Sequence, residues 1–212
     1  MNAIEKFKAA LSASEIQVLH QCLKQAMQPL PEDAVPWYLG GSQAAAGHIM
    51  PAHAKVLQSL SSQWTDLSLG LHWDTPERTH ASRSQALAEF AKQLHDLGYV
   101  TGWRNEKFSF WEDHVIGIGP RCLEPRSELP AAFEMERSAF RFFGLRSHAV
   151  HVNGFTPEGR LWCGRRALTK STDPGMLDNL AAGGLPVGES LQSCGVREMA
   201  EEAGVAETLA LT

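Results

Sequence analysis

The sequence predicts an α+β protein, and three observations support this fold class. Apolar residues recur at helical spacing in several segments, and other short segments alternate apolar with small or polar residues as strands do. No segment is repeated or of low complexity. The chain has 212 residues, of which 43% are hydrophobic, so it is long enough to bury a core in one large or two small domains.

The first segments predict two helices and several short strands. Apolar residues at helical spacing run from Ile4 to Met27, where Ser12 or Ser14 can cap a second helix and Pro29 ends it. The alternating segments 36–51 and 67–73 are typical of short strands or loops.

The middle of the chain predicts two further helices with strands beside them. Residues Ser84 to Leu97 form an amphipathic pattern that stops at Gly98, and the segment 106–113 reads as a strand. After the proline-bearing segment 120–130, residues Phe133 to Phe143 predict a helix that ends at Gly144.

A strand pair is predicted next, over 149–155 and 160–167 with a turn at 156–159. The proline-bearing segment, or the helix that follows it, is the natural place for a domain boundary. We therefore expect an N-terminal accessory α+β domain over 1–145 and a second domain over 146–212.

Composition excludes several classes of partner. The formal net charge of −5 gives no basic field that would attract nucleic acid or anionic lipid, and no apolar run approaches the roughly 20 residues of a membrane span. The four cysteines lie far apart without a Cys-x-x-Cys pair, which favours reduced, structural thiols (Cys22, Cys122, Cys163 and Cys194). We expect a cytoplasmic protein that binds neither nucleic acid nor membranes.

The residues between 183 and 205 match a known motif at every fixed position. The pattern is G-x5-E-x7-R-E-U-x-E-E-x-G-U, where U is a bulky apolar residue. It is filled by Gly183, Glu189, Arg197, Glu198, Met199, Glu201, Glu202, Gly204 and Val205. Seven of these positions require a single residue type, so a chance match at a given start is expected on the order of once in a billion.

The motif also has a physical reading. Residues from about Leu191 to Ala203 favour a helix that Gly204 stops, and Glu198, Glu201 and Glu202 at i, i+3 and i+4 share one face of it. Their charges repel, and a hard divalent cation such as Mg²⁺ or Mn²⁺ would remove the repulsion. The alternative is a solvated acidic helix face.

The motif resembles the box of the Nudix hydrolases, which implies an α/β/α sandwich with a mixed sheet and cleavage of diphosphate linkages. The resemblance implies that Glu198, Glu201 and Glu202 are the catalytic metal ligands, and that a small-molecule diphosphate is the substrate. It also implies that Arg197 and Glu189 pair to orient the helix and its carboxylates, with Gly183 and Gly204 in the same supporting role.

Further segments are similar to the Nudix domain that is fused to thiamine pyrophosphokinase in some fungi. They are HVNGF at 151–155, TKSTDPGMLDNLAAGG at 169–184 and the region around GHIMPAHAKVL. This similarity implies hydrolysis of thiamine diphosphate, or of its oxidised analogues, to the monophosphate. The alternatives are a hydrolase of nucleoside diphosphate derivatives such as NADH or ADP-ribose, and a binding module without turnover.

Five residues near the box are candidates for substrate binding. Arg165, Arg166 and Lys170 could meet a diphosphate, and Asp178 and Asn179 offer polar groups that could orient a ring or a phosphate. The alternatives are a solvated surface for the cations and a structural loop for the other two. Four tryptophans could stack on a ring, although core packing is the stronger expectation for each (Trp37, Trp73, Trp103 and Trp111).

The resemblance also implies strands and a helix beyond the box, whereas the sequence has seven residues after Val205. We therefore expect that the Nudix sandwich is incomplete here and that the chain is truncated, or that another chain supplies the rest. Open sheet edges would pair with a partner, and a homodimer is the simplest arrangement of this kind.

Overall fold

The computed structural model describes residues 2–26, 29–112, 130–170 and 173–210. Contacts between residues divide the chain into two compact units. The sheet unit contains residues 31–148 and 184–191, and the box unit contains residues 1–30, 149–183 and 192–212. The sequence did not predict that the N-terminal helices group with the box, and the domain division at residue 145 stays a prediction.

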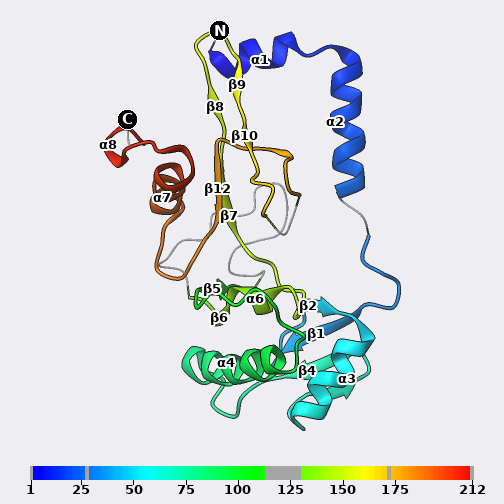
Figure 1. Cartoon of the computed structure of the whole chain (residues 1–212). Coiled ribbons are helices and arrows are strands. Elements are labelled where there is room, and N and C mark those ends of the chain that lie inside the picture. The colour runs from blue at the N-terminus through cyan, green and yellow to red at the C-terminus, as the bar shows by residue number, and fades with distance from the viewer. Residues whose placement is uncertain (1, 27–28, 113–129, 171–172, 211–212) are drawn as a thin grey trace. The chain divides into compact units, whose positions relative to one another are not determined.

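A mixed four-stranded sheet organises the sheet unit, with the strand order β2-β1-β4-β3. Strands β1, β2 and β4 are labelled in Figure 1. Strand β1 pairs antiparallel with β2 and parallel with β4, and β3 is antiparallel to β4. The bounds are Val35–Leu39 for β1, Ala45–Ile49 for β2, Thr65–Leu67 for β3 and Gly70–Trp73 for β4. Alternate residues of β1, β2 and β4 are buried, as the alternating sequence predicted.

Helices α3 (Pro51–Leu60) and α4 (His80–Asp96) contribute buried side chains to the same core. Helix α4 begins four residues earlier than predicted, because the Thr79 side chain accepts a hydrogen bond from the Ser82 backbone N–H and Ser82 reciprocates. It ends before Gly98, which has a positive φ of 82° as the sequence predicted.

The predicted helix over Phe133 to Phe143 is wrong in its first part. Residues Phe133–Glu136 form strand β6, which pairs antiparallel with β5 (Lys107–Phe110), and the short helix α6 (Arg137–Phe140) follows. Burial of Phe133 and Met135 on one face of this ladder decides the outcome over helical propensity.

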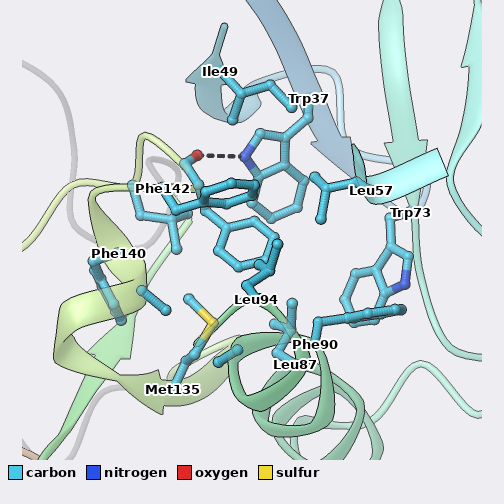
Figure 2. Close-up of a cluster of buried hydrophobic side chains, with 14 of the residues drawn as sticks. Trp37, Ile49, Leu57, Trp73, Leu87, Phe90, Leu94, Met135, Phe140 and Phe142 are labelled. Carbon is cyan, nitrogen blue, oxygen red and sulfur yellow. Dashed lines mark hydrogen bonds between the residues drawn. The ribbon is translucent and has the colours of Figure 1, made fainter. Parts of the chain in front are cut away.

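Aromatic residues dominate the core of the sheet unit (Figure 2). The Trp37 indole N–H donates to the Phe143 carbonyl oxygen at 2.8 Å, and both side chains pack against Trp64. The indole of Trp37 therefore has a hydrogen-bond partner although it is fully buried.

The box unit is built from helices and short two-stranded ladders. Strand β7 pairs with β12, β8 with β9, and β10 with β11. The strands are β7 (Ala149–Val152), β8 (Gly154–Phe155), β9 (Leu161–Trp162), β10 (Gly164–Arg165), β11 (Leu177–Asp178) and β12 (Ala181–Gly184). The helices are α1 (Ala3–Ala10), α2 (Ala13–Ala26), α7 (Leu191–Ala203) and α8 (Glu207–Ala210).

The N-terminal helix α1 packs on the β8–β9 hairpin of the box unit. The Lys6 Nζ donates to the Pro157 carbonyl oxygen at 2.7 Å, and the Phe7 and Phe155 rings meet edge to face at 5.5 Å. The hairpin turns at Gly159, as predicted, and its backbone lies against α1. These contacts tie the start of the chain to the half that carries the box.

Helices and a mixed sheet together confirm the α+β fold class. The mixed sheet lies in the sheet unit, and in the described part of the box unit the ladders have two strands each, so the Nudix sandwich itself stays a prediction. Within the described residues, no helix has both the length and the apolar character needed to cross a membrane.

Candidate active site

Helix α7 carries the second half of the box motif. It spans Leu191–Ala203 as predicted, and Gly204 follows it with a φ of 66°, the left-handed conformation that ends a helix. The Val205 N–H donates to the Met199 carbonyl oxygen at 3.1 Å and closes the last turn. The second half of the box therefore forms one helix with a defined end.

One face of α7 is buried against the strands of the box unit. Cys194, Gly195 and Glu198 are buried on this face. A β-carbon on Gly195 would lie 3.3 Å from the Val150 side chain, so the glycine allows the helix to approach β7 closely. The spacing of the motif thus serves packing as well as chemistry.

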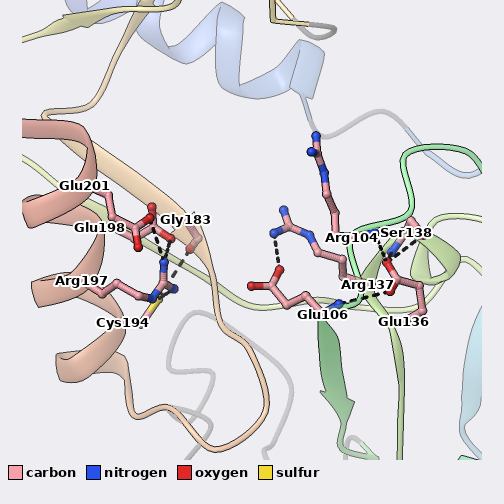
Figure 3. Close-up of polar contacts among 10 residues, drawn as sticks. All are labelled: Arg104, Glu106, Glu136, Arg137, Ser138, Gly183, Cys194, Arg197, Glu198 and Glu201. Atoms are coloured by element: carbon pink, nitrogen blue, oxygen red, sulfur yellow. Dashed lines mark hydrogen bonds and ion pairs between the residues drawn. The ribbon is translucent and has the colours of Figure 1, made fainter.

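Gly183 and Glu198 approach each other closely within the box (Figure 3). A β-carbon on Gly183 would lie 1.7 Å from the Glu198 Oε1 atom, which is far inside van der Waals contact. Only glycine at position 183 leaves room for the carboxylate in this position. The sequence predicted that Gly183 shapes the box, and this contact gives a physical reason.

Arg197 holds two of the box glutamates (Figure 3). Its Nη1 atom lies 2.7 Å from Glu198 Oε1 and 3.4 Å from Glu201 Oε2, and its Nη2 atom lies 3.7 Å from Cys194 Sγ. One guanidinium therefore offsets part of the repulsion that the glutamate spacing implies. The expected pairing of Arg197 with Glu189 stays a prediction.

Glu202 lines a cavity of about 220 Å³ in the box unit. Its Oε2 atom accepts a hydrogen bond from the Ala182 backbone N–H at 3.1 Å, which fixes the side chain beside β12. The same cavity is lined by Arg165, Arg166, Lys170, Asp178 and Asn179. The structure thus brings all five predicted substrate-binding residues together with one of the three predicted metal ligands.

The cations of this cavity have different partners. The Arg166 guanidinium pairs with the Asp178 carboxylate, and this hydrogen bond lowers the pKa of Asp178 below its usual value. Arg165 donates to the Gly175 carbonyl oxygen at 2.8 Å, and the Lys170 ammonium has no hydrogen bond or ion pair to another described residue. Arg165 and Lys170 therefore form no ion pair with a carboxylate of the described chain.

A polar network behind Asn179 was not predicted from the sequence. His151 Nδ1 lies 2.8 Å from Asn179 Oδ1, and Asn179 Nδ2 donates to Asn153 Oδ1 at 2.6 Å. His151 and Asn153 are two residues apart, and such a spacing on a strand places side chains on the same side. That spacing is the sequence signal that could have indicated them.

Other predicted residues are placed as follows. Trp37, Trp73 and Trp111 are buried and Trp103 is partly buried, which confirms the expectation of core packing. Cys194 is buried, as expected of a structural thiol, whereas Cys22 and Cys163 are exposed and their structural role stays a prediction. Cys122 lies outside the described residues.

The carboxylates fit a divalent metal in part. Within the described residues, no three His, Cys, Asp or Glu side chains converge to form a complete protein cage for a metal. Magnesium does not need one, because it is commonly held by one or two carboxylates with waters and substrate phosphates. Glu201 and Glu202 are exposed oxygen donors of this kind, whereas Glu198 is buried.

These contacts define a strand-and-helix site in which a box carboxylate lines a cationic cavity. Comparisons with known proteins find relatives that are named Nudix hydrolases. The chain is 36% identical over 173 residues to Nudix hydrolase 24, chloroplastic, of Arabidopsis thaliana, which is 77% of this chain and 43% of that protein. It is 38% identical over 147 residues to Nudix hydrolase 20, chloroplastic, of the same plant, which is 68% of this chain and 35% of the relative.

A third similar protein, the uncharacterized protein YJR142W of Saccharomyces cerevisiae, is 29% identical over 135 residues, or 60% of this chain and 35% of the relative. No family model matches the chain. The chain spans less than half the length of the curated relatives it matches. The two plant similarities support the Nudix hydrolase family for this protein.

Proposed function

We propose that the protein is a Mg²⁺- or Mn²⁺-dependent Nudix hydrolase that cleaves a diphosphate linkage in a small organic substrate. The observation behind the proposal is the cavity that Glu202 of the box shares with Arg165, Arg166 and Lys170. Guanidinium and ammonium groups are suited to phosphate oxygens, and a carboxylate beside them suits a divalent metal.

The chain's own residues would divide the work between them. Arg165 and Lys170 bind and orient the diphosphate, since neither side chain forms an ion pair with a carboxylate of the described chain. Glu201 and Glu202 offer carboxylate oxygens to the metal, and Arg197 and Gly183 hold Glu198 beside them. A bound Mg²⁺ or Mn²⁺ offsets phosphoryl charge and lowers the pKa of an attacking water.

Thiamine diphosphate, or its oxidised analogues, is the substrate that we propose. The segment 169–184, which resembles the thiamine-type enzymes, contributes Lys170, Asp178 and Asn179 to the cavity beside Glu202. The resemblance thus concerns residues that line the proposed site. A nucleoside diphosphate derivative such as NADH or ADP-ribose is the alternative substrate, and a binding module without turnover is the alternative class.

The proposal is tested by a hydrolysis screen of diphosphate compounds, in which products are separated by chromatography, with the Glu202→Gln variant beside the unchanged protein. We expect turnover to fall roughly 10²- to 10³-fold in the variant, as when one electrostatic group of an active site is removed. Glu207→Gln, an exposed glutamate of α8, is the matched control and should keep full activity.

Unchanged hydrolysis after EDTA treatment, or in Glu202→Gln, would contradict the metal assignment. A kcat/KM for NADH or ADP-ribose well above that for thiamine diphosphate would contradict the substrate but leave the class of reaction standing. Tight binding of all these compounds without turnover would favour the binding module. The homodimer and the cytoplasmic location stay predictions.

A further inference from the structure

A second cavity, of about 280 Å³, lies in the box unit and has no assigned role. Its lining residues come from β9, from β11, from the residues that follow these strands, and from the residue between β7 and β8: Asn153, Leu161, Cys163, Leu177, Asp178 and Asn179. Asp178 and Asn179 also line the cavity that contains Glu202. The two cavities therefore share these two residues as a common wall.

The common wall is held in place from both sides. One Asp178 oxygen pairs with Arg166 and the other accepts from the Asn179 backbone N–H at 2.9 Å. The Asn179 amide is bound at its oxygen by His151 and at its nitrogen by Asn153. Because both side chains are fixed by hydrogen bonds, the wall is preorganised and does not have to form when a ligand binds.

The two cavities differ in chemistry. The first contains the cations Arg165, Arg166 and Lys170, whereas the lining of the second has no arginine or lysine and includes the apolar side chains of Leu161 and Leu177. A diphosphate suits the first lining, and an uncharged or ring-shaped organic group suits the second.

Size leads to the same division. Sites for small organic molecules usually enclose about 300–1,000 Å³. Each cavity alone, at about 220 Å³ or 280 Å³, falls below this range, and the pair falls inside it. A substrate that carries a diphosphate and an organic ring needs both.

We propose that the second cavity binds the organic group of the substrate while the first binds its diphosphate, with the Asp178–Asn179 wall between the two parts. This inference rests on the proposed function. Leu161 and Leu177 then act as specificity residues through apolar contact. The Asn153 amide lies beside the Asn179 amide and can form hydrogen bonds with polar atoms of the ring.

The exposed Cys163 thiol allows a direct test without turnover, because it lines the second cavity. The full chain is alkylated with iodoacetamide, and labelling of each cysteine is followed by peptide mass spectrometry. The probes are thiamine diphosphate, ADP-ribose and inorganic pyrophosphate, each at about ten times its dissociation constant. Cys22, an exposed thiol of α2 in the same unit, is the internal reference.

We expect an organic diphosphate to slow labelling of Cys163 about tenfold, as mass action requires for a covered thiol, while pyrophosphate leaves it unchanged. Labelling of Cys22 should not change with any probe. Equal slowing by pyrophosphate, or no slowing by either organic compound, would overturn the inference. Slowing by ADP-ribose alone would support the second cavity and contradict thiamine as the ring.

Steady-state kinetics give a second, independent readout. Leu161→Ser should raise KM for the organic substrate about tenfold with little change in kcat, because the lost contact is uniform binding. Leu161→Met keeps an apolar side chain and should leave KM near the parent value. Leu168→Ser is the control, because Leu168 is exposed and lines neither cavity. An unchanged KM in Leu161→Ser would overturn the assignment of this residue.

Failure of the inference and failure of the proposed function are distinguishable. Normal hydrolysis with an unprotected Cys163 contradicts the second cavity as the ring site and leaves the hydrolase standing. Protection of Cys163 without any hydrolysis contradicts the hydrolase and supports the binding of an organic diphosphate across both cavities.

Discussion

The two units of the chain are built on different physical terms. The sheet unit buries an aromatic and aliphatic core, whereas among the described residues of the box unit the buried apolar positions are Ala181 and Cys194. The box unit instead contains the Arg197–Glu198 and Arg166–Asp178 pairs and the two cavities. Stability and chemistry are thus largely carried by different parts of one chain.

The contrast shows how a unit with few buried apolar side chains can hold a site in place. Hydrogen bonds and close glycine contacts, such as the one between Gly183 and Glu198, replace the apolar packing that fixes side chains in the sheet unit. Charged hydrogen bonds are individually stronger than neutral ones, but each depends on a single partner. The box unit should therefore be sensitive to the loss of single polar groups.

The largest expected effect concerns the core of the sheet unit. Trp37→Ala should lower the free energy of unfolding by about 3–5 kcal/mol, because it leaves a cavity and deprives the Phe143 carbonyl of its donor. Chemical denaturation followed by circular dichroism measures this. Trp162→Ala, which removes a tryptophan that is 60% exposed in the box unit, is the control and should change it little.

A cost for Trp162→Ala as large as that for Trp37→Ala would break the comparison, since it would show that the box unit also depends on large apolar contacts.

An intermediate effect is expected for Arg197, for which we propose an orienting role. Arg197→Ala should lower stability by roughly 1.5–3 kcal/mol, because the buried Glu198 carboxylate loses its charged partner. Turnover of the hydrolysed substrate should fall with it. Thermal unfolding and initial rates measure both, with Arg160→Ala, an exposed arginine outside the cavities, as the control.

Loss of turnover in Arg197→Ala with an unaltered melting temperature would contradict an orienting role and favour direct contact with the substrate.

The smallest expected effect is the response to acid. In the sheet unit, burial raises the pKa of Asp74, whereas its hydrogen bonds and its ion pair with Arg83 lower the pKa. The lowering is the larger effect, so the net pKa is below the usual value. The pKa of Asp178 in the box unit is lowered by Arg166. Each carboxylate therefore contributes stability above the unfolded pKa of about 3.9, and this is lost as pH falls through the folded pKa.

Amide hydrogen exchange between pH 5 and pH 3, corrected for the intrinsic rate, reads the two units separately. Asp74→Asn should reduce the acid dependence of exchange in the sheet unit. Asp178→Asn should reduce the acid dependence of exchange in the box unit by a smaller amount. The difference is expected because the Asp74 side chain is 10% exposed and that of Asp178 is 32% exposed. Identical acid profiles in the variants and the parent would contradict a contribution of these ion pairs to the acid dependence of stability.

The parts of the fold that depend on local sequence were predictable. Helix α7 and its stop at Gly204 follow from helix formers and a glycine within one segment, and the turn at Gly159 follows from the residues around it. Strand β6 was not predictable in this way, because its conformation depends on pairing with β5, which lies more than 20 residues away in the sequence.

The site was predictable for the same reason and to the same extent. The glutamate spacing and the cations before the box are local features, and Glu202, Arg165 and Lys170 do line one cavity. The second cavity was not, because Asn153, Leu161 and Leu177 meet only through the pairing of separate ladders. The docking of α1 on the hairpin is long-range in the same sense.

That docking has a consequence for how the chain is made. Helix α1 emerges from the ribosome before its partners Phe155 and Pro157, which follow only after residues 31–148 have been synthesised. At about 5–20 residues per second, the interval from Phe7 to Phe155 lasts roughly 7–30 s, during which Phe7 has no hairpin to cover it. The sheet unit, whose residues are almost all contiguous, can begin to fold in that interval, before the hairpin of the box unit has been made.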